Sequence, residues 1–220
     1  MRIKTLFIAI SAHLVCFTGI AQDQADKQDV GTWTNVTIAS KLIAGKWKTW
    51  YSLEYKSKEN LRELDTSSAM FKFHYLINNH VSIGMGYEFF LKNAGNGELT
   101  HRHRYFPEGM LSYTINRFSF IFRSRLMNTF LQWIHPYFEH RNMLRVSYTL
   151  EKIPVKPFIS AEPYHEIVEK KYRFYKGRYA VGGSYIFKKR HQLDLYYMQE
   201  FFHTIPFTRH VIGIDYIYSL

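Results

Sequence analysis

Apolar and polar residues alternate with a period of two along most of this chain. From Trp47 to Tyr55 every second residue is apolar or neutral, whereas Lys48, Glu54 and Lys56 occupy positions between them. The same alternation recurs over residues 71–77, 81–89, 118–126, 144–150, 179–187, 193–201 and 212–220. A period of two places successive side chains on opposite faces of a strand. The sequence therefore predicts an all-β protein whose strands each separate two different environments.

The apolar face is too aromatic and too extensive for the core of one soluble domain. The chain of 220 residues contains 18 Phe and 17 Tyr, and one parity in each segment is free of Lys, Arg, Asp and Glu. A charge on a lipid-facing strand position costs about 2–4 kcal/mol at the bilayer midplane, which explains this exclusion. The pattern predicts a transmembrane antiparallel up-and-down β-barrel, with a soluble β-sandwich as the alternative.

The N-terminus has the features of a secretory signal. Arg2 and Lys4 precede an apolar stretch, and Gly19 and Ala21 occupy the small-residue positions before a cleavage site. This stretch is too short and too often interrupted to span a membrane as a helix. Residues 1–21 are therefore predicted to be a cleaved signal peptide, and residues 22–220 a single barrel domain in the outer membrane.

Removal of this signal changes the chemistry that the chain can perform. The only cysteine, Cys16, is lost with it, so the mature chain has no disulfide, thiolate metal site or cysteine nucleophile. Loss of Arg2 and Lys4 lowers the formal net charge from +11 to +9. Such a charge suits nucleic acid, anionic lipid or anionic solutes, but export argues against nucleic acid.

The connecting segments predict the topology. Short turns at 43–46, 78–79, 115–117, 151–154 and 188–191 alternate with longer polar segments at 57–67, 92–100, 130–136, 165–172 and 203–207. Because barrels of this kind have short periplasmic turns and longer extracellular loops, the longer segments are predicted to face the exterior. Eleven segments have strand character when 33–41 is included, whereas single-chain barrels close with even numbers. About 10–12 strands are predicted, with 12 favoured by an additional strand before Trp33.

The face opposite the apolar one carries arginines and carboxylates, which would line the lumen. Guanidinium–carboxylate pairing satisfies charges that have little access to bulk water. The predicted lumen charge network comprises Glu54, Arg102, Arg104, Arg123, Arg125, Glu139, Arg141, Arg145, Glu162, Arg178 and Glu200, with Glu108 and Asp194 on the same face. Two interpretations are open: a plug of side chains in a structural barrel, and a narrow pore or binding lumen that favours anions.

Several short motifs occur in a fixed order along the chain. They are Trp33, Glu54, Gly84-x-Gly86-Tyr87, Arg123-x-Arg125, Arg141 to Arg145, Glu162, Arg178 with Gly182-Gly183, and a tyrosine-rich last segment. In this order the chain resembles an uncharacterised family of outer-membrane barrels, known as domain of unknown function twenty-four-ninety. The resemblance extends from about Gly31 to the C-terminus. It implies an outer-membrane barrel and carries over no catalytic residue, because the family has no assigned activity.

A lipid-modifying enzyme is the alternative function. Outer-membrane acyl hydrolases and transferases use Ser, His and a carboxylate near the outer rim. The candidates near predicted exterior ends are Ser67, Ser68, His101, His103, His135, His140, His165 and His203. No G-x-S-x-G motif is present, and His101-x-His103 lacks a third metal ligand at a recognisable spacing. No catalytic residue, metal site or cofactor is therefore predicted.

These features favour a small monomeric barrel with a structural or transport role over an enzyme. The expected partners are outer-membrane lipid, the barrel-assembly machinery through the C-terminal strand, and a small anionic solute.

Overall fold

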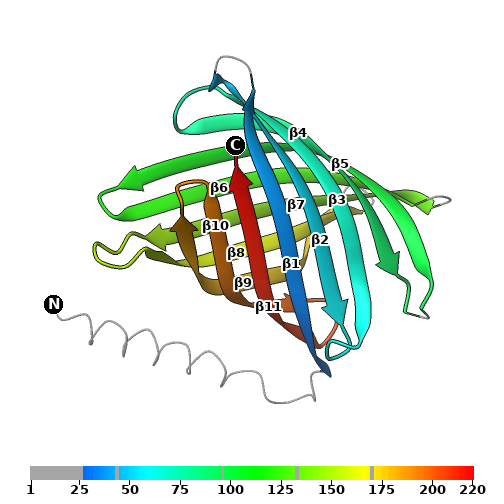
Figure 1. Cartoon of the computed structure of the whole chain (residues 1–220). Helices are drawn as coiled ribbons and strands as arrows, with labels where there is room; N and C mark the ends of the chain where they lie inside the picture. The colour runs from blue at the N-terminus through cyan, green and yellow to red at the C-terminus, as the bar shows by residue number, and fades with distance from the viewer. Residues whose placement is uncertain (1–26, 43–44, 96, 132–133, 169–170) are drawn as a thin grey trace.

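The computed structural model describes residues 27–42, 45–95, 97–131, 134–168 and 171–220, and the predicted signal peptide lies outside these ranges (Figure 1). The described residues form eleven strands and no helix that is long and apolar enough to cross a membrane. The strands are β1 (Lys27–Leu42), β2 (Trp47–Lys58), β3 (Glu63–Leu76), β4 (Val81–Asn93), β5 (Leu99–Ile115), β6 (Phe118–Leu131), β7 (Ile134–Tyr148), β8 (Val155–Val168), β9 (Lys171–Phe187), β10 (His191–Phe202) and β11 (Phe207–Ser219).

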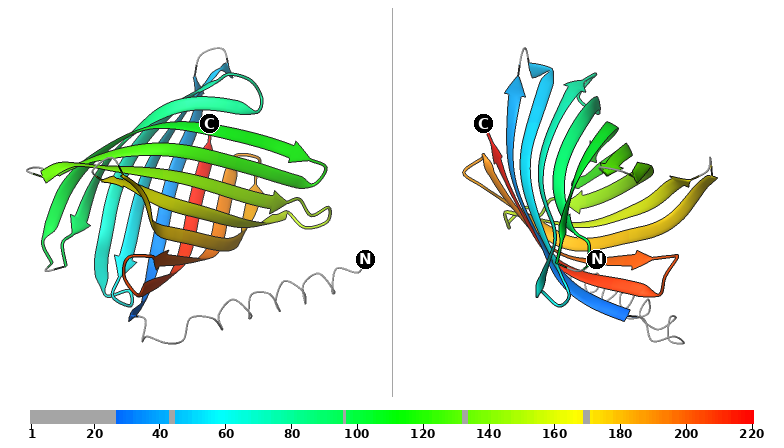
Figure 2. Two further views of the ribbon diagram at one scale, coloured as in Figure 1. Left: turned by 180° about the vertical axis from the view of Figure 1, so that it is seen from behind. Right: turned by 90° about the vertical axis from the view of Figure 1, so that its right-hand side faces the viewer.

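The strands close into one barrel, which confirms the predicted fold class. Each strand pairs antiparallel with its neighbours in sequence, and β1 closes the barrel by pairing parallel with β11. Figure 2 shows the strands of opposite walls crossing at a steep angle, as strongly tilted barrel strands do.

The closure corrects the expectation of an even strand number. The count among the described residues is eleven, within the predicted range, but the favoured twelfth strand before Trp33 is instead the beginning of β1. An odd number of sequentially antiparallel strands leaves the first and last strands pointing in the same direction, so their contact must be parallel. The register of this contact runs from Lys27↔Phe207 to Ala39↔Ser219.

The predicted difference in loop length is wrong within the described structure. The strands continue into the polar segments, so that residues 59–62 separate β2 from β3 and residues 203–206 separate β10 from β11. Residues 149–154, which include the predicted short turn at 151–154, form a longer connection than either. The two sets of connections still lie at opposite ends of the barrel. We call the end that holds Leu220 the proximal end and the other the distal end.

The two faces of the wall have the predicted parity. Outward side chains such as Leu53, Ile159 and Ile212 are 57–65% exposed, whereas the inward Asp194 and Glu200 are only 2% exposed. The sequence periodicity follows from this arrangement, because the apolar surface of this barrel faces outward and its charges face the lumen.

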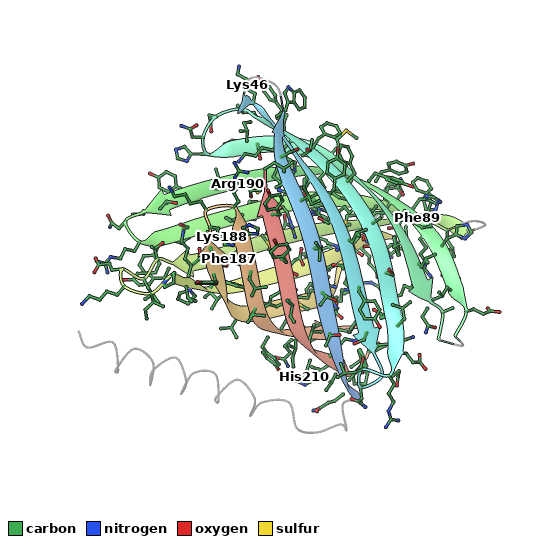
Figure 3. All side chains as sticks on the ribbon, in the orientation of Figure 1. Lys46, Phe89, Phe187, Lys188, Arg190 and His210 are labelled. Atoms are coloured by element: carbon green, nitrogen blue, oxygen red, sulfur yellow. The ribbon has the colours of Figure 1, made fainter. Side chains whose placement is uncertain are left out.

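Aromatic side chains form a belt around each end of the outer surface. Contacts in the distal belt are Tyr87–Tyr105, His140–Tyr172 and Tyr197–His210. Contacts in the proximal belt are Trp47–Tyr75, Phe118–Tyr148 and His191–Tyr218. In Figure 3, Phe187 lies near Lys188 and Arg190 at the proximal end, whereas Phe89 and His210 lie toward the distal end. Along β5, Tyr105 and Tyr113 are separated by roughly 27 Å of strand, or about 20 Å of height at a tilt of about 40°.

Candidate functional site

A cavity of about 740 Å³ occupies the lumen. Its lining begins at distal residues such as Asp65, Lys92 and Arg209, and it extends to Thr37 and Ile217. Ile217 is close to the proximal end of β11, which ends at Ser219. The cavity therefore extends along most of the barrel height beside β1 and β11.

The structure places nearly all of the predicted network in this cavity. The wall includes Glu54, Arg102, Arg104, Arg123, Arg125, Glu139, Arg141, Glu162, Arg178 and Glu200. Arg145 is the one member of the predicted network that does not line the cavity. Its Nη2 donates to Asp194 Oδ2 at 2.8 Å and to Ser184 Oγ at 2.7 Å, and its guanidinium lies 3.6 Å from the ring centroid of Phe158.

Glu162 is the centre of the network on β6, β8 and β9. Arg123 Nη2 donates to its Oε1 at 2.8 Å, and Tyr164 donates to its Oε2 at 2.6 Å. Arg178 Nη1 lies 3.5 Å from the same Oε2. One carboxylate therefore compensates two guanidinium groups.

Glu200 continues the network toward the distal end. Arg178 Nε donates to its Oε1 at 2.8 Å, and Lys176 Nζ lies 3.1 Å from the same oxygen. Arg209 Nη1 is 3.8 Å from Oε2 and also contacts Asp65 at 3.3 Å. Three cations surround this buried carboxylate.

Glu108 is a second shared carboxylate, on β5. Arg125 Nη2 lies 2.5 Å from its Oε2, while His74 Nε2 lies 2.6 Å and Lys72 Nζ 3.8 Å from Oε1. In other parts of the wall the pairs are simpler. Arg104 binds Glu88 at 2.9 Å, Lys56 binds Glu54 at 2.5 Å, and Arg141 binds Glu139.

Arg102 differs from the other described cations of the cavity wall, because it has no carboxylate partner among the described residues. Its Nε is buried without a hydrogen-bond partner there. It is two residues from Arg104 on the same face of β5. A half-buried guanidinium without a carboxylate partner, beside a second guanidinium, is a position where an anion would be stabilised.

Side chains occupy the lumen on the β8–β10 side and narrow it. Phe158 is 5% and Met198 4% exposed, and Tyr196 packs against a cluster of Trp33, Met198 and Val211. Gly213 allows this packing, since a Cβ there would lie 2.0 Å from the Tyr196 ring. The free space is therefore confined to part of the cross-section.

The sequence matches the model of a family described as Protein of unknown function (DUF2490) over residues 30–210. The chain belongs to this family. No curated protein matches the sequence significantly.

Two solved structures are similar to this DUF2490 chain. The beta domain of the Bordetella autotransporter BrkA has 11% sequence identity and a TM-score of 0.45, over 80% of this chain and 82% of its own. The KdgM porin, solved in complex with disordered oligogalacturonate, has 15% identity and a TM-score of 0.45, over 74% and 81% of the two chains. Because these sequence identities and TM-scores are low, neither structure indicates a function for the DUF2490 chain, and its own residues are the basis for one.

The distal histidines whose side chains are described form no hydrogen bond with Ser67 or Ser68, the two serines proposed from the sequence. Ser67 faces outward on β3, while Ser68 is buried on the inward face. Among the described residues neither has a hydrogen bond to a histidine. His140 instead contacts Ser124 and Tyr172 on the outer surface.

Of the other distal histidines, His103 forms a hydrogen bond through its Nδ1 with the Tyr87 hydroxyl at 2.7 Å. The ring centroid of His103 lies 6.2 Å from that of His101. The ring of His165 stacks on Tyr172 at 4.4 Å, and that of His203 lies 5.7 Å from Phe174. The side chain of His135 lies outside the described structure.

Several charged residues of the cavity wall were not in the predicted network. They are Lys56, Asp65, Lys72, Glu88, Lys92, Lys176 and Arg209. Asp65 and Lys92 were placed in predicted loops, whereas the structure continues β3 and β4 through them. The inward parity of Glu88 and Lys72 was a signal that could have identified both.

Proposed function

We propose that this protein is an outer-membrane β-barrel that forms a narrow, anion-selective pore. The charge balance of the cavity carries this proposal. Eleven lysine and arginine side chains line the cavity, against six aspartate and glutamate side chains of the wall and two further carboxylates, Glu108 and Asp29, that pair with wall cations without lining the cavity. Because Glu162 and Glu200 are each shared by several of these cations, the positive excess is left for a mobile anion to compensate.

Two features of the outer surface support a membrane location. The outward face is mainly apolar and carries many exposed large hydrophobic side chains, and an aromatic belt borders it at each end. The two aromatic belts are separated by about 20 Å of height, which is close to the roughly 25 Å height of the apolar band in outer-membrane barrels. The predicted signal peptide supplies the route of export.

We expect the folded protein to require detergent or lipid and to show heat-modifiable migration on a gel. A closed ladder of backbone hydrogen bonds resists detergent until it is heated, so boiled and unboiled samples should run differently. Circular dichroism should report mainly β structure in both detergent and lipid vesicles. A soluble, detergent-free monomer of residues 22–220 would contradict the membrane location.

Reconstitution into planar bilayers tests the pore itself. We expect discrete conductance steps and, in a potassium chloride gradient, a reversal potential that indicates chloride preference. Conductance should be small because side chains of the β8–β10 wall narrow the lumen. A folded, heat-modifiable sample that stays electrically silent would overturn the pore and leave a structural barrel.

A further inference from the structure

A serine, a histidine and a tyrosine form a continuous hydrogen-bonded chain on the outer surface of the barrel. Ser124 Oγ lies 2.9 Å from His140 Nε2, and the other ring nitrogen, Nδ1, lies 2.7 Å from the Tyr172 hydroxyl. The three side chains come from β6, β7 and β9. A hydroxyl, a base and a group that orients the base are the elements of nucleophilic acyl transfer.

These three hydrogen-bonded side chains lie in an unusual position for polar groups. Ser124 has the outward parity of Phe122 and Leu126, which are 43% and 42% exposed. His140 and Tyr172 belong to the distal aromatic belt, and such belts lie where lipid headgroups meet acyl chains. The ester bonds of membrane lipids lie at this depth. Polar side chains on a lipid-facing wall are costly, so their presence together indicates a use.

An apolar groove adjoins the pair. It has a volume of about 520 Å³, and Ser124 and His140 line it together with Trp47, Phe73, Met85 and Leu126. The groove exists because the wall is thin there: Gly109 contributes no side chain, and a Cβ at this position would meet no atom within 4 Å. The groove therefore extends from the serine over a surface that suits a hydrocarbon chain.

The backbone beside the groove is also irregular. Pro107 has no backbone N–H group and so cannot donate a hydrogen bond to a neighbouring strand. The pairing of β5 with β6 is interrupted between the residue pairs Tyr105↔Asn128 and Glu108↔Arg125. Asn142 lies directly opposite Ser124 in the β6–β7 register and shares its outward face. Side chains in this relation are within reach of a common ligand.

From these observations we infer that Ser124 and His140 form a catalytic site that hydrolyses acyl esters of membrane lipids. This inference is independent of the pore, because the site is on the outer surface and none of its residues lines the lumen cavity. The substrate class follows from the location: an ester carbonyl at the distal belt with its acyl chain in the groove.

The reaction proceeds in two acyl-transfer steps. With Nδ1–H donating to Tyr172, Nε2 accepts the Ser124 proton as Oγ attacks the ester carbonyl carbon. The carbon–oxygen bond to the lipid alcohol breaks, and His140 returns the proton to the leaving oxygen. Water then attacks the acyl-serine with its proton passing to His140, which releases the fatty acid and restores Ser124. The side-chain amide of Asn142 donates to the oxyanion that forms in both steps.

The test measures fatty acid release from phosphatidylethanolamine in mixed detergent micelles by the purified, heat-modifiable protein. We expect Ser124→Ala and His140→Gln each to lower the rate at least about 10³-fold, and Asn142→Leu to lower it about 10²-fold. A serine-directed fluorophosphonate should label the wild type at Ser124. Ser67→Ala is the matched control, since Ser67 is also an outward serine, and it should retain full activity.

Two further variants separate catalysis from stability. Tyr172 is a positioning residue, so Tyr172→Phe should lower kcat roughly tenfold with KM unchanged, the effect of one lost hydrogen bond. A Cβ at Gly109 would meet no atom within 4 Å, so Gly109→Leu should place its side chain in the groove and raise KM while fluorophosphonate labelling persists. Wild-type release equal to that of Ser124→Ala, with no label on Ser124, would overturn the inference. Conductance does not depend on either outcome, so the two proposals fail separately.

Discussion

Replacing Glu162 with glutamine is expected to lower the free energy of unfolding by about 3–5 kcal/mol, because it leaves the Arg123 guanidinium without its carboxylate partner inside the lumen. Glu162 lies 2.8 Å from Arg123 and 3.5 Å from Arg178, and Arg178 keeps its second partner, Glu200, at 2.8 Å. The substitution keeps the shape of the side chain, so that lost packing does not contribute. Urea titration of the protein in lipid vesicles, followed by tryptophan fluorescence, would measure the change.

Glu151→Gln provides the matched control. Glu151 forms an ion pair with Arg117 at a turn, where both side chains are exposed. Exposed pairs contribute about 0–1 kcal/mol, so this variant should unfold almost like the wild type. Equal stabilities for the two variants would contradict the central position of Glu162 in the network.

The sequence was sufficient for the fold class because one physical constraint acts on every strand. A charge cannot face the acyl chains cheaply, so parity is recorded in residues such as Leu53 against Glu54 and Phe122 against Arg123. Parity also assigns a residue to the lumen without any knowledge of its neighbours. That is why arginines of β5, β6, β7 and β9 could be proposed as lining residues from alternation alone.

Strand ends and closure could not be obtained in this way. The residues around Asp65 and Lys92 are polar like a loop, but they continue the strands because the wall extends beyond the apolar band. The parallel contact of β1 with β11 joins residues 180 apart in sequence, such as Asp29 and Arg209, whose side chains lie 2.8 Å apart. Nothing local in either segment specifies that partner.

The outer-surface site was missed for a related reason. Ser67 and Ser68 were the candidate nucleophiles from the sequence because they lie near the predicted exterior ends of strands, whereas Ser124 lies within a strand. Its contact with His140 depends on the β6–β7 register, in which Leu126 faces His140 and Ser124 faces Asn142. Tyr172 reaches the same histidine across the intervening β8. Register and side-chain direction are set by the closed barrel and cannot be read from motif spacing.

Arg102→Glu is expected to lower the chloride-to-potassium permeability ratio of the reconstituted protein at least tenfold. A unit charge at about 5 Å changes the energy of an ion by roughly 0.8 kcal/mol even at the dielectric constant of water. The substitution changes the side-chain charge at position 102 by two units, which raises the energy of an anion and lowers that of a cation. The permeability ratio should therefore change strongly even after screening by salt. Reversal potentials in a potassium chloride gradient would measure this ratio.

Arg102 is the best position for this test because its replacement leaves no described carboxylate without its cation, and the new glutamate would lie beside Arg104. The variant should therefore stay as stable as the wild type. Arg173→Glu is the control for charge alone: Arg173 pairs with Glu166 and its side chain is 64% exposed, so the ratio should hardly change. If Arg102→Glu folds normally and retains the wild-type ratio, the ions do not pass the β5 wall of the cavity. The excess of lumen cations would then serve only to bind the shared carboxylates of a structural barrel.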